Sequence, residues 1–117
     1  MGDARFTRDE RIKKSGEIKL LFKKGSPVSI GGAKLFVSGN GTGGNRVAFT
    51  LPRHFGTAVQ RNRVKRLCRE AYRLRKNTLR SGHDLLFLMY SGPDSFGFRD
   101  GQLRRLCKKA GLLRISG

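Results

Sequence analysis

The sequence predicts an α+β fold: a single-domain two-layer sandwich in the order α-β-β-β-α-β-α, with about four strands in a mixed sheet. Three observations support it. The 117 residues are enough for one domain with a real core. Strand-like and helix-like periodicities follow one another without an internal repeat. The segment between Gly56 and Gly82 contains neither Gly nor Pro, so a long helix can form between two strand regions.

The first 14 residues are polar and basic, with Phe6 as a lone apolar anchor, and we expect a mobile basic arm at the start of the 1–117 domain. Ser15 can cap a short helix that ends at Gly25. Its apolar face consists of Ile18, Leu21 and Phe22. Pro27 and the glycines at 31 and 32 make a helix unfavourable there, so residues 28–30 are expected to form a short irregular strand.

Residues 33–38 alternate as a strand does, and the alternation places Lys34 and Phe36 on one side of it. The following run, 39–44, satisfies the pattern G-x-G-x-x-G. That pattern indicates a dinucleotide site only where a helix follows at once. Residues 45–51 instead alternate apolar and polar side chains, which predicts a strand. We therefore expect the glycines to form a hairpin loop.

The stretch 55–75 organises the chain. Thr57 is a suitable N-cap, and at roughly 100° per residue one face of the helix is apolar. This face comprises Val64, Leu67, Cys68, Ala71 and Leu74. The opposite face comprises Asn62, Lys65, Arg66, Arg69 and Arg73, with Arg61 and Arg63 on its shoulders. Only Glu70 supplies a counter-charge within the helix, so a polyanion is the expected partner.

Residues 84–90 are continuously apolar and predict a buried central strand. A final helix should turn Leu103, Leu106, Cys107 and Ala110 inward and its Arg and Lys residues outward. Cys68 and Cys107 are the only cysteines, without zinc-site or disulfide spacing, and are expected to be small buried apolar groups.

The charge balance favours nucleic-acid binding, because 26 Lys and Arg face eight Asp and Glu, for a net charge of +18. No segment approaches the roughly 20 apolar residues of a membrane span, and the N-terminus lacks a signal-peptide core. We therefore expect a cytoplasmic location, with no membrane and no obligate protein partner.

Autonomous catalysis is disfavoured. The acidic residues are scattered, with only Asp9 and Glu10 adjacent, and His54 and His83 are the only histidines. A metal-dependent or acid–base nuclease would need a carboxylate cluster or a paired acid and base. Phe22 and Phe36 could stack on unpaired bases or pack in the core, and the sequence leaves both alternatives open.

Residues 58–66, Ala-Val-Gln-Arg-Asn-Arg-Val-Lys-Arg, closely resemble the signature of the protein component of bacterial ribonuclease P. The resemblance continues through residues 69–73 and covers nearly the whole chain, including residues 21–25, 35–37 and 46–50. It implies an unusual left-handed βαβ crossover around the long helix.

The resemblance also implies an accessory subunit of a ribonucleoprotein endoribonuclease, a hydrolase whose catalyst is the RNA. The protein would have no catalytic residues, no metal site and no tightly bound cofactor, and Mg²⁺ would be required through the RNA. The implied partners are ribonuclease P RNA and precursor tRNA, whose 5′ end is matured. The implied RNA-binding residues are Arg53, Arg61, Asn62, Arg63, Lys65, Arg66 and Arg69. A cleft for the 5′ leader would use Ile18, Phe22, Lys34 and Phe36. The alternative is a structural RNA binder, similar to a ribosomal protein, without a role in cleavage.

Overall fold

The computed structural model describes residues 10–93 and 95–114. Its sheet contains β1 (Ser26–Ile30), β2 (Ala33–Gly39), β3 (Arg46–Thr50) and β4 (His83–Met89), in the spatial order β1-β2-β4-β3. The helices are α1 (Ser15–Lys24), α2 (Ala58–Arg75) and α3 (Phe96–Lys109), and a short 3₁₀ helix, Lys76–Thr78, follows α2. The predicted α+β class and element order are therefore confirmed.

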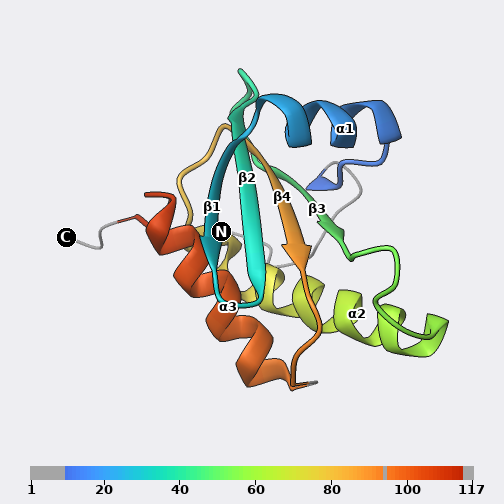
Figure 1. Ribbon diagram of the computed structural model, residues 1–117. Helices are drawn as coiled ribbons and strands as arrows, with labels where there is room; N and C mark the ends of the chain where they lie inside the picture. Colours follow the sequence, from blue (N-terminus) through green and yellow to red (C-terminus); the bar gives the residue numbers. More distant parts are fainter. Residues whose placement is uncertain (1–9, 94, 115–117) are drawn as a thin grey trace.

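The sheet is mixed, and its two faces are covered differently. β1, β2 and β4 pair antiparallel, whereas β3 runs parallel to β4. Strand alternation turns Leu35 and Phe87 toward the main core with α2 and α3. It turns Phe36 and Leu86 toward a smaller cluster under α1. Consequently α2 and α3 form one helical layer, and α1 covers one end of the opposite face (Figure 1).

The unit β3–α2–β4 is the crossover between parallel neighbours. In Figure 1 both strands run downward, β4 lies to the left of β3, and α2 passes behind the sheet. This arrangement makes the crossover left-handed, as expected from the family resemblance and against the general right-handed rule.

The same strand order corrects one expectation. The glycine-rich run after β2 leads into a strand, β3, and not into a helix, as predicted. It is not a hairpin loop, however, because β4 inserts between β2 and β3. A strand supplied from later in the chain is not visible in local periodicity.

The start of α2 is confirmed, but its buried face differs from the prediction. Thr57 is the N-cap and forms a reciprocal capping box with Gln60. Tyr72 is buried at 2% exposure and packs edge-on against Phe49, whereas Leu74 is 55% exposed. Assigning Leu74 to the core was therefore wrong, because the buried face of α2, which packs on α3 and β3, includes Tyr72 instead.

The N-terminal segment also differs from expectation. Residues 1–9 lie outside the described residues, but the end of the expected arm is docked on the sheet. Arg11 forms a parallel bridge with Val47, and the Ile12 amide donates to the Val47 carbonyl oxygen at 3.0 Å. Ile12 is buried under α1, which holds this segment in place. Ser15 is the first helical residue rather than the N-cap, and the N-cap Lys14 makes no side-chain capping bond.

The two cysteines behave as predicted. Cys68 on α2 and Cys107 on α3 are both buried in the main core as free thiols. Burial raises the pKa of each thiol to about 12, so neither is a thiolate at neutral pH. None of the helices that the structure describes is long and apolar enough to cross a membrane.

Candidate nucleic-acid interface

The cationic ridge of α2 begins at a firmly fixed helix end. The Thr57 hydroxyl accepts a hydrogen bond from the Gln60 amide at 3.2 Å, and the Gln60 side-chain oxygen accepts from the Thr57 amide at 2.9 Å. This capping box satisfies amides that the first turn of a helix leaves without partners. Most of the predicted RNA-binding side chains beyond it are exposed, and the exposed ones are Asn62, Arg63, Arg66 and Arg69.

Arg61 is half-buried and has a structural role that the sequence did not reveal. Its guanidinium donates a 2.9 Å hydrogen bond to the Pro52 carbonyl oxygen. The Phe55 amide donates to the same carbonyl at 3.1 Å, so this atom organises the turn before α2. Arg53 lies on that turn and is exposed. Arg61 therefore joins the ridge to the connector that presents Arg53. Lys65 is also half-buried.

The carboxylates of the described residues are all engaged in ion pairs. The pairs are Glu10–Lys76, Glu17–Arg46, Asp84–Arg46, Glu70–Arg73 and Asp100–Arg75. Within residues 10–93 and 95–114, no group of three His, Cys, Asp or Glu side chains could hold a metal ion. These five carboxylates therefore join elements of the fold to one another or pair within α2.

The side chains predicted to form the leader cleft lie between α1 and the sheet. Ile18 and Phe36 are half-buried against the small cluster beneath α1. Phe22, which is 41% exposed, meets the Phe36 ring edge-on, with centroids 5.0 Å apart. The two rings, one on α1 and the other on β2, are therefore in contact with each other. Lys34 is half-buried two positions from Phe36 on the same face of β2.

A polar network holds α1 in this position. The Arg46 guanidinium donates to Glu17 of α1 at 2.8 Å and to both oxygens of Asp84 at 3.0 and 2.6 Å. Asn40 Nδ2 adds a 3.0 Å hydrogen bond to Asp84. Burial raises the pKa of Asp84, but the hydrogen bonds from Arg46 and Asn40 outweigh it, and the net pKa is lowered. Asp84 thus stays ionised and anchors Arg46.

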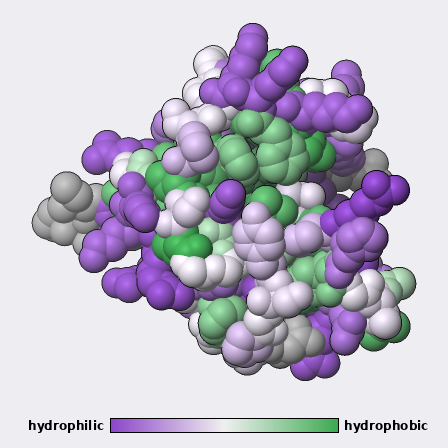
Figure 2. All heavy atoms as spheres, in the orientation of Figure 1, coloured by the Kyte–Doolittle hydropathy of each residue, from purple (hydrophilic) through white to green (hydrophobic). Residues whose placement is uncertain are grey.

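A groove of about 300 Å³ connects the two predicted sets of residues. Ile18 of α1 and Arg69 of α2 both line it, and Arg11 and Lys13 of the N-terminal segment add further cations. In the view of Figure 1, hydrophobic surface lies beneath α1 and is bordered by hydrophilic side chains (Figure 2). Arg11 and Lys13 were not included in the predicted site, because this segment was expected to be a mobile arm. The apolar side chain of Ile12 between them indicates that the segment can pack on the sheet.

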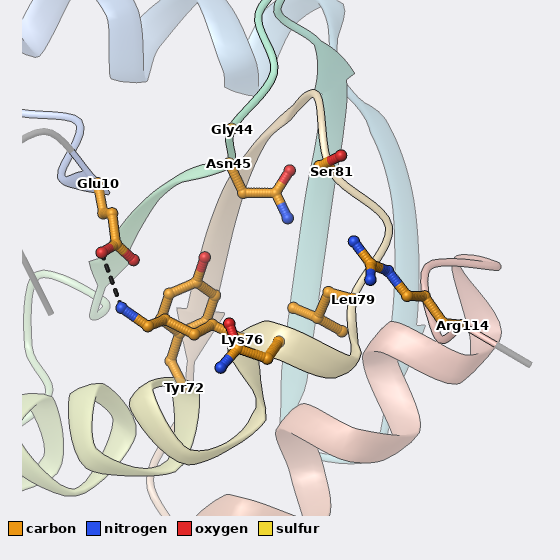
Figure 3. Close-up of a pocket in the computed structure, with 9 residues that line it drawn as sticks. Glu10, Gly44, Asn45, Tyr72, Lys76, Leu79, Ser81 and Arg114 are labelled. Atoms are coloured by element: carbon orange, nitrogen blue, oxygen red, sulfur yellow. Dashed lines mark hydrogen bonds and ion pairs between the residues drawn. The ribbon is translucent and has the colours of Figure 1, made fainter. Parts of the chain in front are cut away.

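A larger cavity, of about 530 Å³, lies at the C-terminal end of α2 (Figure 3). The Lys76 ammonium and the Glu10 carboxylate pair at 2.8 Å at one side of it. The Asn45 amide in its wall is already used, since it donates to the Arg80 carbonyl and accepts from the His83 amide. None of the predicted site residues lines this cavity.

These features define a class of protein: a small, strongly basic α+β domain with a helical ridge and an adjoining groove suited to an anionic chain. A model of the family Ribonuclease P matches residues 6–111. The chain belongs to this family.

Curated relatives agree over nearly the full length. The ribonuclease P protein component of Natranaerobius thermophilus is 36% identical over 105 residues, which cover 88% of this chain and 91% of the relative. That of Clostridium kluyveri is 33% identical over 108 residues, covering 89% and 96%. The solved RNase P protein of Thermotoga maritima superposes with a TM-score of 0.77 at 25% identity, covering 92% and 99% of the two chains. The Staphylococcus aureus RNase P protein has a TM-score of 0.80 at 22% identity, covering 90% and 98%, which supports the fold.

Proposed function

We propose that this chain is the protein subunit of a ribonuclease P ribonucleoprotein. In this proposal the protein binds the catalytic RNA and the 5′ leader of precursor tRNA, and the RNA performs the cleavage that matures the tRNA 5′ end. The observation that carries the proposal is the continuity from the α2 ridge, through Arg69, into the groove beside α1. One surface can therefore bind a structured RNA at the ridge and a single strand in the groove.

The ridge suits RNA phosphates. Arg53 and the exposed cations of α2 can donate to phosphate oxygens, which supplies affinity and position without base specificity. The exposed amide of Asn62 lies among them and can either donate to the RNA or hold local geometry. Among the described carboxylates only Glu70 pairs with a ridge residue, Arg73, which supports the use of this surface for an anionic partner.

The groove and the adjoining aromatic pair suit an unpaired leader. Arg11 and Lys13 can contact its phosphates, while the exposed part of Phe22 offers a surface on which a base can stack. Because Phe22 and Phe36 are in contact, a base stacks on the outside of the pair rather than between the rings.

The described part of the chain does not offer a metal site. Its described carboxylates are in ion pairs, and no metal-binding cluster is found among those residues. In this proposal magnesium is bound by the RNA. The protein's cations instead offset phosphate repulsion that magnesium otherwise screens.

Reconstitution tests the proposal. The purified chain is combined with ribonuclease P RNA and precursor tRNA, and 5′ cleavage is compared with that of either component alone at low and high magnesium. We expect no cleavage by the protein alone and the largest gain in rate at low magnesium. A structural RNA binder would bind RNA without raising the cleavage rate, and that result would replace the proposal with this alternative.

A further inference from the structure

The outward face of α3 is a second charged surface, separate from the α2 ridge and the groove. Its two flanks are fixed by contacts. Asp100 faces α2, because Arg75 of α2 binds its carboxylate with two 2.6 Å hydrogen bonds. Lys109 faces β1, because its ammonium donates to the Ser29 carbonyl at 2.7 Å. At about 100° per residue, the arc between these flanks contains Gly97, Phe98, Gly101, Arg104, Arg105 and Lys108.

The C-terminal half of this arc is cationic. Arg104, Arg105 and Lys108 are exposed, and the sole carboxylate of α3, Asp100, is already bound by Arg75. Arg104 and Lys108 are four residues apart, a spacing at which like charges repel on a helix. The arrangement therefore costs stability in the free protein, and a bound polyanion would relieve the repulsion.

The N-terminal half of the arc contains two glycines, Gly97 and Gly101, beside the half-buried Phe98, and the Arg105 guanidinium donates to the Gly101 carbonyl at 3.4 Å. A Cβ atom added at Gly97 or Gly101 would meet nothing within 4 Å, and neither residue has a positive φ. The fold itself does not require glycine there, and glycine disfavours a helix relative to alanine. Without side chains at these positions, a partner can approach the helix axis closely while the adjacent cations bind it.

We propose that this face of α3 docks on the phosphate backbone of the RNA subunit, at a segment different from the one bound by α2. The inference rests on the proposed function. The RNA subunit is favoured over precursor tRNA because α3 lies in the α2 layer, across the sheet from the groove beside α1 (Figure 1). The protein then bridges two parts of one RNA.

The test is the salt dependence of binding to ribonuclease P RNA without tRNA. The variant combines Arg104→Gln, Arg105→Gln and Lys108→Gln. The control, Lys19→Gln with Lys23→Gln and Lys24→Gln, removes the same charge from exposed positions of α1. Each lost phosphate contact lowers the slope of log affinity against log salt by about 0.7 to 0.9. Loss of three contacts lowers this slope by about 2 to 3. The ratio of wild-type to variant affinity should therefore fall about 20- to 40-fold between 50 and 200 mM salt.

Hydroxyl-radical footprinting of the RNA completes the test. We expect the α3 variant to lose protection of one backbone segment while the segment protected by α2 remains, and Arg66→Ala to do the reverse. Gly101→Ala should raise the thermal midpoint yet weaken RNA binding. An α3 variant with the wild-type slope and footprint overturns the inference and leaves the proposed function standing. Failure of the wild-type chain to bind this RNA overturns both.

Discussion

Replacing Phe22 with Ala should weaken binding of a single-stranded leader far more than it weakens the fold. The Phe22 ring is 41% exposed, and its main aromatic contact is the edge of Phe36. A fully buried Phe→Ala change costs about 3–5 kcal/mol, and an aromatic pair adds about 0.5–1.5 kcal/mol. For this partly exposed ring we expect a loss of about 1–2 kcal/mol in the free energy of unfolding.

The loss of leader binding follows from stacking. A base stacked on an aromatic side chain is worth about 1–3 kcal/mol, which corresponds to about 5- to 150-fold in affinity. The assay is a pair of titrations of the reconstituted holoenzyme with precursor tRNA and with mature tRNA, at fixed salt and magnesium. The Phe22→Ala holoenzyme should bind precursor tRNA more weakly by this factor, and its affinity for mature tRNA should hardly change.

Two further variants make the test specific. Leu20 lies on the same helix and is 49% exposed, so Leu20→Ala removes a comparably exposed apolar group and should affect neither substrate. Phe36 packs in the cluster beneath α1, so Phe36→Ala should cost more stability and affect leader binding partly through α1. Equal losses for both tRNA substrates, or an equal loss in Leu20→Ala, would show that the leader does not stack on Phe22.

The remaining predictions concern the ridge, the α1 anchor and the anion dependence of folding. Arg66→Ala should weaken holoenzyme assembly by about 1–3 kcal/mol with little change in unfolding, since Arg66 is exposed, whereas Arg61→Ala should also destabilise the protein, since it loses the bond to Pro52. Denaturant unfolding measures the effect on stability, and RNA titration measures the effect on binding. An Arg61→Ala variant as stable as the wild type would contradict the structural role assigned to Arg61. Asp84→Asn should lower the free energy of unfolding at pH 7 by about 1–3 kcal/mol by unpairing Arg46. Because the folded-state pKa of Asp84 lies below its ordinary 3.8, its contribution is present above that pH and is lost as pH falls below it. Acid unfolding curves should therefore converge for wild type and variant, and curves that stay parallel would refute the mechanism. Sulfate that binds the folded protein should raise its thermal midpoint. At a sulfate concentration of 100 times the dissociation constant, the free energy of unfolding should rise by about 2.7 kcal/mol, and a midpoint that is the same in sulfate as in chloride would contradict this.

The sequence predicted the elements well because each carries its own local signal. The α2 start follows from Thr57, and the central strand follows from the apolar run around Phe87. The orientation of α2 could not be predicted, because burial of Tyr72 rather than Leu74 depends on how the helix packs against α3 and the sheet. Tyr72 also carries a hydroxyl, which makes it ambiguous in a hydrophobic pattern.

The candidate site was predicted as two lists of residues, and the structure shows how they meet. The contact between Phe22 and Phe36 and the bond from Arg61 to Pro52 both join segments distant in sequence or separated by a turn. Periodicity assigns side chains to faces but does not specify which faces touch. The docking of Ile12 on β3 was missed for the same reason.

β4 is the last of the four strands in chain order, yet it lies between β2 and β3 and is hydrogen-bonded to both. During synthesis, α2 therefore leaves the ribosome before the strand that completes the sheet on which it packs. Until His83–Met89 has been made, β3 has no neighbouring strand, and the apolar face of α2 has no finished surface to cover. The nascent chain thus carries a long, unprotected basic segment past ribosomal RNA, and its folding has to wait for the arrival of β4.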